Sequence, residues 1–193
     1  MYGRRPYPLL LKGVLKLKQS SKCAIGGIVS ALSLVLMISV AIVPFLTYAL
    51  PAVAGLLIVF IVVEIDKKWA FGVYAAVGIL AFLLVPDKEV AMMYIAFFGY
   101  YPIIKAVLES RLPVALCWII KVVTFAVTMV AAYLFLIFVM GITIDEIDEF
   151  GAVAVPMLLG AGCVAFVAYD IALTRIITVY LLKWRKYFKR YFK

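Results

Sequence analysis

The longest stretch without a charged residue lies between Lys22 and Glu64 and is apolar almost throughout. A transmembrane helix needs about 20 apolar residues, so this stretch is about twice as long as one crossing requires. Pro44 and Pro51 lie near its middle, and proline removes a backbone donor and restricts the residue before it. We therefore expect two membrane-spanning helices here, joined by a turn or an unwound passage between the prolines.

Further apolar segments, separated by short charged or proline-containing stretches, follow along the rest of the chain. This pattern predicts an all-α membrane bundle of six transmembrane helices. The expected spans are residues 23–43, 50–65, 69–85, 90–108, 114–142 and 152–169. They form one domain, residues 23–182, between a basic N-terminal segment, residues 1–22, and a basic aromatic tail, residues 183–193. Leucines among the N-terminal lysines favour a short helix at the membrane surface.

Lysine and arginine gather on one side of the predicted spans. They occur in both terminal segments, after the second span and around the turn between the fourth and fifth spans, whereas Lys88 stands alone on the other side. Because short loops rich in lysine and arginine remain in the cytoplasm, we expect both termini to be cytoplasmic.

Composition excludes a soluble domain. Of the 193 residues, 68% are hydrophobic and the mean hydropathy is +1.18, which is more apolar surface than a soluble fold of this size can bury. The net charge of +9 is concentrated at the two ends beside membrane spans, so we expect contact with anionic lipid and not with nucleic acid.

The three cysteines lie inside or at the edge of apolar segments and show no paired spacing; they are Cys23, Cys117 and Cys163. This placement favours buried thiols over a disulfide or a metal site.

No catalytic motif is present in the sequence. Histidine, the commonest metal ligand and general base, does not occur. The chain also contains no GxSxG, HExxH or phosphate-binding GxxxxGK[ST] motif. We therefore expect neither enzymatic activity nor a metal or other cofactor, and uphill transport would need energy from a partner protein.

The first span begins with small residues four positions apart, namely Cys23, Gly27 and Ala31. Residues at this spacing lie along one helix face, and small side chains there let another backbone approach closely. Two interpretations remain open at this point. The face packs against a neighbouring span of the same chain, or it docks a partner protein from the cytoplasmic half of the membrane.

Two groups of residues are candidates for ligand binding. Thr47 and Tyr48 lie in the outer turn between the first two spans, which is either a simple turn or a loop that closes over a ligand. Four aromatic residues of the fourth span recur every three or four positions, so they either line a cavity or pack between helices. They are Tyr94, Phe97, Phe98 and Tyr101. Gly99 and Pro102 predict a kink beside them.

Ionisable residues within the spans are few, and we expect them near the cytoplasmic ends. Charged groups inside a membrane are functional candidates by default. Here anchoring at the membrane interface is favoured, since lysine and arginine side chains can extend to the interface. Asp170 is expected to pair with Arg175 or Lys121. Because no charge is expected in the middle of a span, an ion-coupled pump is disfavoured. The residues concerned are Glu64, Lys105, Lys121, Asp170 and Arg175.

The six short spans, the first-span sequence SKCAIGGIVSALSLVLM and the proline-marked outer loop resemble the substrate-binding S components of energy-coupling factor (ECF) transporters. In that family, a small-residue face on the first helix docks onto a transmembrane T component that two ATPases drive. The resemblance implies that Gly27 and Ala31 take this role, with Cys23 one turn earlier where the family has a small residue such as alanine. It also implies that residues 44–51 form a lid over the ligand and that the chain lies in a bacterial cytoplasmic membrane.

These features predict a membrane subunit that binds a small nutrient, a vitamin or related micronutrient, and passes it to ATP-driven partners. Because the spans offer no buried counter-charge, we expect a neutral or largely apolar ligand. An anion would have to use Lys88 at the rim, and a cation the acidic residues 145–149. The alternative is a non-transporting membrane scaffold or interaction protein, whose basic tail binds lipid or a soluble partner.

Overall fold

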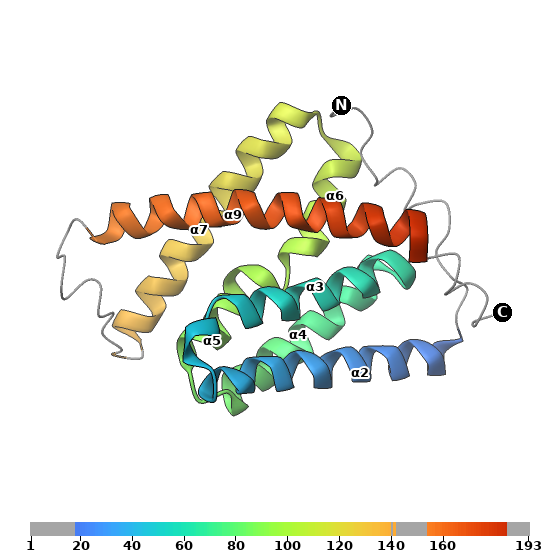
Figure 1. Ribbon diagram of the computed structural model, residues 1–193, viewed down its shortest axis with the longest axis horizontal. Coiled ribbons are helices and arrows are strands. Elements are labelled where there is room, and N and C mark those ends of the chain that lie inside the picture. The colour runs from blue at the N-terminus through green and yellow to red at the C-terminus, as the bar shows by residue number, and fades with distance from the viewer. Residues whose placement is uncertain (1–17, 140, 142–153, 185–193) are drawn as a thin grey trace.

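The computed structural model describes residues 18–139, 141 and 154–184, and every regular element in these ranges is a helix (Figure 1). The predicted surface helix within residues 1–17, the acidic residues 145–149 and residues 185–193 of the basic tail lie outside the described residues. Predictions for those three segments therefore stay predictions.

The helices of the described chain follow the predicted apolar segments in order. The fourth and sixth segments each contain a π-helical turn, and short 3₁₀ turns follow the first helix. The elements are α2 (Gln19–Ile38), η1 (Ser39–Ala41), η2 (Pro44–Leu46), α3 (Ala49–Glu64), α4 (Lys67–Leu84), α5 (Lys88–Met93), η3 (Tyr94–Phe98), α6 (Tyr101–Arg111), α7 (Val114–Phe138), α9 (Ala154–Val179) and η5 (Tyr180–Trp184).

Five helical segments within the described residues are long and apolar enough to cross a membrane, which is typical of a multi-pass membrane protein. The sixth apolar helix, α3, has 16 residues. At 1.5 Å per residue it is about 24 Å long, shorter than the hydrocarbon core of about 30 Å. The structure thus gives five clear candidate spans where the sequence pattern predicts six.

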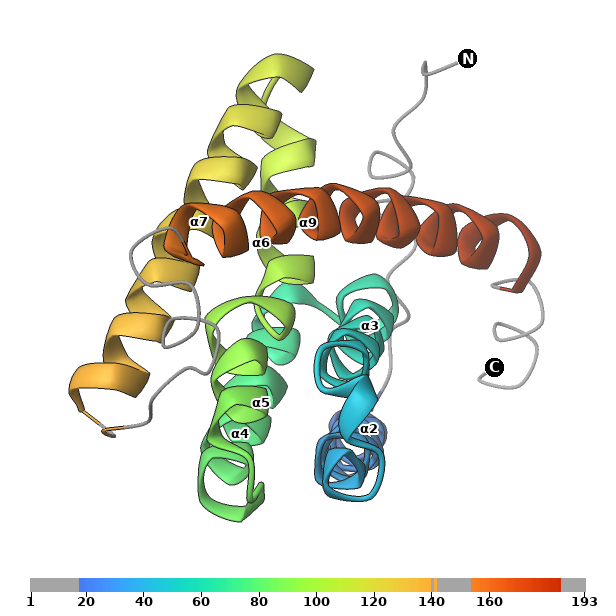
Figure 2. The same cartoon turned by 60° about the vertical axis from the view of Figure 1, so that its left-hand side comes forward.

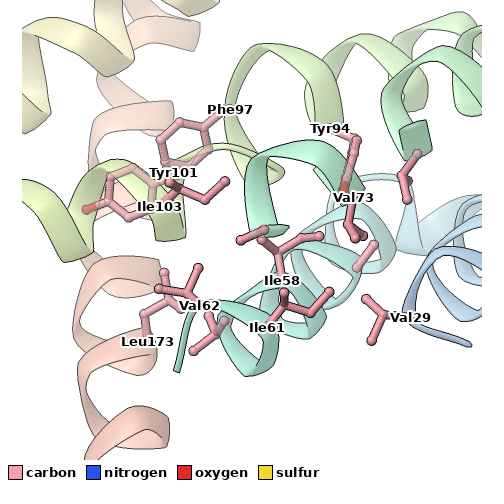
Figure 3. Packing of buried hydrophobic residues seen from close by; sticks show 14 of the residues in the cluster. Val29, Ile58, Ile61, Val62, Val73, Tyr94, Phe97, Tyr101, Ile103 and Leu173 are labelled. Atoms are coloured by element: carbon pink, nitrogen blue, oxygen red, sulfur yellow. The ribbon is translucent and has the colours of Figure 1, made fainter. Parts of the chain in front are cut away.

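Helix α3 is the centre of the bundle. Nine of its 16 residues are buried, and it packs against α2, α4, α6 and η3. Figure 3 shows Ile58, Ile61 and Val62 of α3 among side chains from the surrounding helices. A helix enclosed on most sides needs no polar face, which explains why α3 carries no charged residue before Glu64.

The ends of the helices are set by local chemistry. Pro51 lies in the first turn of α3, where its missing N–H has no intrahelical partner to lose. The carboxylate of Asp66 accepts a hydrogen bond from the backbone N–H of Lys67 at 2.7 Å, and Asp87 caps α5 through the N–H of Glu89 at 2.9 Å. In the turn between α4 and α5, the ammonium group of Lys88 donates to the carbonyls of Phe82 and Val85 at the end of α4.

The predicted kink in the fourth apolar segment is confirmed, and its cause is a π-helical turn. The N–H of Gly99 donates to the carbonyl of Tyr94 at 2.8 Å, five residues back, and Pro102 follows in the first turn of α6. One extra residue per turn shifts the register of the helix. The side chains of α5 and α6 therefore face different neighbours.

Helix α9 crosses α6 and α7 in both views of the molecule (Figures 1 and 2). The side of α9 that faces away from the other helices carries exposed apolar residues such as Val164, Ile171 and Ile176. Similar exposed apolar residues cover α2, α4 and α7. A water-soluble monomer rarely exposes apolar surface on this scale, whereas a lipid-facing helix does so by necessity.

Candidate functional site

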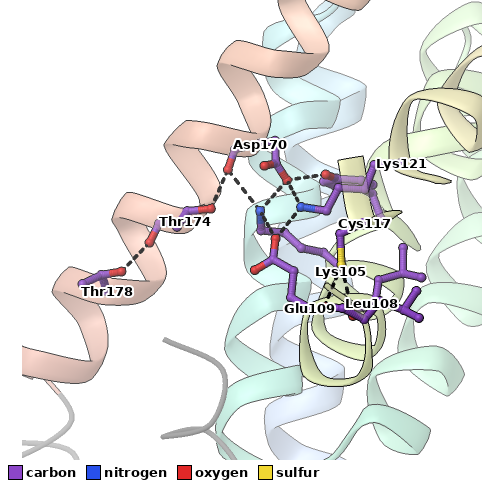
Figure 4. A network of polar contacts seen from close by, with 10 residues as sticks. Lys105, Leu108, Glu109, Cys117, Lys121, Asp170, Thr174 and Thr178 are labelled. Atoms are coloured by element: carbon purple, nitrogen blue, oxygen red, sulfur yellow. Dashed lines mark hydrogen bonds and ion pairs between the residues drawn. The ribbon is translucent and has the colours of Figure 1, made fainter. Parts of the chain in front are cut away.

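Four charged side chains from three helices form a closed ring inside the bundle. Lys105 and Glu109 come from α6, Lys121 from α7 and Asp170 from α9, and we call them the ionic ring (Figure 4). Each ammonium group contacts both carboxylates. Lys105 lies 2.9 Å from Glu109 and Lys121 lies 3.0 Å from Asp170, while the pairs Lys105–Asp170 and Lys121–Glu109 close the ring.

Neutral groups complete the surroundings of the ionic ring. The hydroxyl of Tyr101 donates to the same Asp170 oxygen that both lysines contact. The backbone carbonyl of Asp170 accepts from Lys105 at 3.3 Å and from the Thr174 hydroxyl at 2.9 Å. The ammonium group of Lys121 also lies 5.3 Å from the centre of the Trp118 ring, within reach of a cation–π interaction.

The four side chains of the ionic ring are almost completely buried. The exposed side-chain fractions are 0% for Lys105, 3% for Lys121, 4% for Asp170 and 11% for Glu109. Charges this deeply buried persist only when they are paired and hydrogen-bonded. Two positive and two negative charges cancel, so the four groups can lie within an apolar bundle and fix α6, α7 and α9 relative to one another.

The pairing of Asp170 with Lys121 is confirmed, whereas no ion pair joins Asp170 to Arg175 in the described chain. The part of Lys105 and Glu109 in the site was not predicted from the sequence. Their i,i+4 spacing, which places both side chains on one helix face, is the signal that could have revealed it.

The sixth helix continues well past Tyr169, through α9 and η5 to Trp184. Asp170 therefore lies within this helix and not at its end, and Lys105 and Lys121 supply the opposite charge beside it. The depth of Asp170 in a membrane, and the expectation that no charge lies in the middle of a span, stay predictions.

The four aromatic candidates of the fourth segment lie together in the packed interior. Tyr94, Phe97 and Tyr101 are buried and Phe98 is partly buried. The ring of Phe97 lies 4.7 Å from that of Tyr101 and 4.9 Å from that of Phe125, centre to centre. Phe166 and Tyr169 of α9 complete this aromatic cluster. Of the two interpretations of the stripe, these contacts are those of helix packing, and a role in ligand binding stays a prediction.

The outer turn contacts α5. Thr47 is partly buried, Tyr48 is exposed, and the hydroxyl of Tyr48 donates to a carboxylate oxygen of Glu89 at 3.2 Å. Glu89 in turn borders a shallow depression between α5 and α7. None of the four aromatic candidates borders this depression, so the two predicted groups of ligand-binding residues do not share it.

The small-residue face of the first helix points away from the bundle. Cys23, Gly27 and Ala31 are exposed, and a Cβ added at Gly27 would meet no atom within 4 Å. The neighbouring Gly26 faces inward, where an added Cβ would lie 3.1 Å from a methyl of Val73. Packing of Cys23, Gly27 and Ala31 within the chain is thus not what the described residues show.

The cysteines follow their expectation only in part. All three are free thiols, and Cys117 is buried, with its thiol donating to the carbonyl of Leu108 at 3.3 Å. Cys163 is partly buried, but Cys23 is exposed because it belongs to the outward face of α2.

Comparisons with models of protein families, with curated proteins and with solved structures give no significant match to this chain. A functional assignment must therefore rest on the residues and their contacts.

Proposed function

We propose that this chain is the substrate-binding membrane subunit of an ATP-driven importer of the energy-coupling factor type. In this proposal the chain crosses a bacterial cytoplasmic membrane six times with both termini in the cytoplasm. It binds a small nutrient, a vitamin or related micronutrient that is neutral or largely apolar, and docks onto a T component driven by two ATPases. The observation that carries the proposal is the outward small-residue face of α2.

Two adjacent glycines of α2 have opposite surroundings, and this contrast supports docking. Gly26 lets α2 approach α4 closely at Val73, whereas the space beside Gly27 is open. Helices in lipid associate through close van der Waals packing, which small residues permit. The exposed small-residue face at Cys23, Gly27 and Ala31 is thus suited to a helix of another protein.

The arrangement of the helices supports the proposed topology. The beginning of α2 and the end of η5 lie at the same end of the molecule in Figure 1. Lysine and arginine flank both ends of the chain, and such residues are retained in the cytoplasm.

We expect Gly27→Leu to abolish co-purification of the two ATPases and the T component while the chain itself stays folded. A Cβ at this position meets no atom within 4 Å, so the leucine side chain extends from the open face and the loss would arise at the partner interface. The measurement is an affinity pull-down of the tagged chain from gently solubilised native membranes, followed by mass spectrometry.

Gly72 of α4 offers a matched control. It is also exposed, and an added Cβ there would likewise meet no atom within 4 Å. Gly72→Leu is therefore expected to retain every partner that the wild type binds. Equal recovery of the partners with both variants, or recovery of no ATPase with the wild type, would contradict docking through α2.

We also expect one vitamin or vitamin precursor to stabilise the purified protein. A ligand present at 100 times its dissociation constant adds about 2.7 kcal/mol to the stability of the state that binds it. A thermal-shift screen in detergent measures this as a rise in the unfolding temperature, with structurally unrelated metabolites as controls. Failure of every vitamin and precursor to raise that temperature would speak against nutrient binding.

A non-transporting scaffold or interaction protein is the second candidate, and the packed interior favours it. The predicted aromatic ligand residues fill the space between helices, where Phe97 lies against Tyr101 and Phe125. A scaffold predicts partners without ATPases in the pull-down and no stabilisation in the ligand screen. The same two experiments therefore separate the two functions.

A further inference from the structure

The turn between α3 and α4 places two lysines beside the last turn of α6, which carries an arginine. Lys67 and Lys68 begin α4, and Arg111 ends α6. The ammonium group of Lys67 donates to the carbonyl of Ala106 at 3.4 Å, so the start of α4 lies against α6. We propose that these three cations, which we call the cationic site, bind the phosphate group of an anionic phospholipid such as phosphatidylglycerol.

The cationic site carries more positive than negative charge. No carboxylate of the described residues lies within ion-pair distance of Lys67, Lys68 or Arg111. Lys67 and Arg111 are close enough for their charges to repel each other, and Asp66 supplies the opposing negative charge. Because the three cations outnumber Asp66, a phosphate diester with one negative charge would reduce the repulsion between them.

The carboxylates near the cationic site are turned to other tasks. Asp66 caps α4 by accepting the N–H of Lys67 at 2.7 Å. Glu109 belongs to the ionic ring, and Glu64 at the end of α3 is only 1% exposed. Lys68 and Arg111 are exposed, and Lys67 is partly buried. The positive charge of the site is therefore directed to the outside of the bundle.

The cationic site lies where a candidate membrane span begins, and apolar surface continues from it. The span Lys67–Leu84 starts at the site. Lys68, Phe71 and Gly72 are exposed and lie on one face of α4, since they are three and four positions apart. Phe71 is 57% exposed, and an added Cβ at Gly72 would meet no atom within 4 Å. An acyl chain can lie along this face while its phosphate contacts the cations.

This arrangement favours an anionic phospholipid over the alternatives. A free phosphate ion would gain nothing from the apolar face of α4. Phosphatidylcholine would bring a fourth positive charge to the cationic site through its quaternary ammonium group, whereas phosphatidylglycerol brings the phosphate charge alone. Basic clusters beside membrane spans commonly bind anionic headgroups. The cationic site is separate in sequence from the two basic ends of the chain, and it does not rest on the proposed importer function.

Trp69 is a local probe of the cationic site, because it follows Lys68 directly and is partly buried. The protein has three tryptophans, so Trp118→Phe with Trp184→Phe leaves Trp69 alone. This protein is placed in phosphatidylcholine vesicles that contain increasing fractions of phosphatidylglycerol with brominated acyl chains. Bromine quenches tryptophan fluorescence only at short range. We expect brominated phosphatidylglycerol to quench Trp69 more strongly than the same fraction of brominated phosphatidylcholine.

Substitutions in the cationic site should reduce this preference for phosphatidylglycerol. Lys67→Gln, Lys68→Gln and Arg111→Gln should each lower it by up to about fivefold, the contribution of one cation near an anionic membrane surface. The triple variant should show no preference. Glutamine at position 67 retains a donor for the Ala106 carbonyl, and unfolding in detergent verifies that each variant is folded.

Lys88→Gln is the matched control, because it removes the same charge beyond the other end of α4, whose 18 residues span about 27 Å. It should leave the quenching of Trp69 unchanged. Equal quenching by the two lipids, a preference that the triple variant retains, or equal effects of Lys88→Gln and Lys68→Gln would overturn the site. Relief of the quenching by inorganic phosphate would assign the cations to a free anion and also overturn it. Gly27→Leu should not alter the quenching, so failure of docking and failure of lipid binding are distinguishable.

Discussion

Asp170→Leu is expected to lower the free energy of unfolding by about 3–5 kcal/mol, because breaking a buried ion pair leaves an uncompensated buried charge. In the wild type, Lys105 and Lys121 share the carboxylates of Asp170 and Glu109. Without Asp170, two buried ammonium groups face one carboxylate, and the Tyr101 hydroxyl loses its acceptor. Denaturant-induced unfolding in mild detergent measures the change.

A double substitution separates the charge from the shape of the side chain. Lys105→Met together with Asp170→Leu removes one positive and one negative charge and leaves the pair Lys121–Glu109 intact. Replacing a buried ion pair with apolar residues of similar volume is often neutral or stabilising. We therefore expect the double variant to be more stable than Asp170→Leu alone. Equal stability of Asp170→Leu and the wild type would contradict a buried ionic ring.

Gly55→Ala is expected to destabilise the protein by about 3 kcal/mol, because overpacking at a rigid contact costs typically 1–3 kcal/mol and occasionally more. A Cβ at this position of α3 would lie 2.4 Å from the backbone oxygen of Phe98 and 2.9 Å from the Tyr169 hydroxyl. The Phe98 oxygen belongs to the π-helical turn η3 and cannot move as a side chain does. The two helices would have to separate. The same unfolding experiment measures the loss.

Gly72→Ala is the control for this prediction. Gly72 is also a helical glycine, but an added Cβ there would meet no atom within 4 Å. Alanine in the middle of a helix is more favourable than glycine by about 0.5–1 kcal/mol, so this variant should be as stable as the wild type or slightly more stable. A small effect at both positions would show that α3 and η3 do not touch at Gly55.

The proposed docking face occupies the first half of α2, which lies at the same end of the molecule as the end of η5 in Figure 1. The ionic ring and the aromatic cluster link α6, α7 and α9.

The sequence by itself determined the order of the apolar helices and the turns between the first four of them, but not the end of the sixth helix, which continues to Trp184. Apolar runs of sufficient length can satisfy their backbone groups in a membrane only as helices, and Pro51, Asp66 and Asp87 mark the turns between them through local effects. These signals act over a few residues, so they can be identified without knowledge of the neighbouring helices. The kink at Gly99 and Pro102 was predictable for the same reason.

Only the tertiary structure decided which side chains meet. Lys105 and Asp170 are 65 positions apart in the chain, and their contact depends on how α9 crosses α6. The spacing of residues along the sequence does not show that Gly26 faces inward and Gly27 outward. Nor does it show that the aromatic residues of the fourth segment pack against Phe125 and Phe166. Periodicity specifies the faces of one helix. The direction in which each face points is fixed by packing against helices that are remote in the sequence.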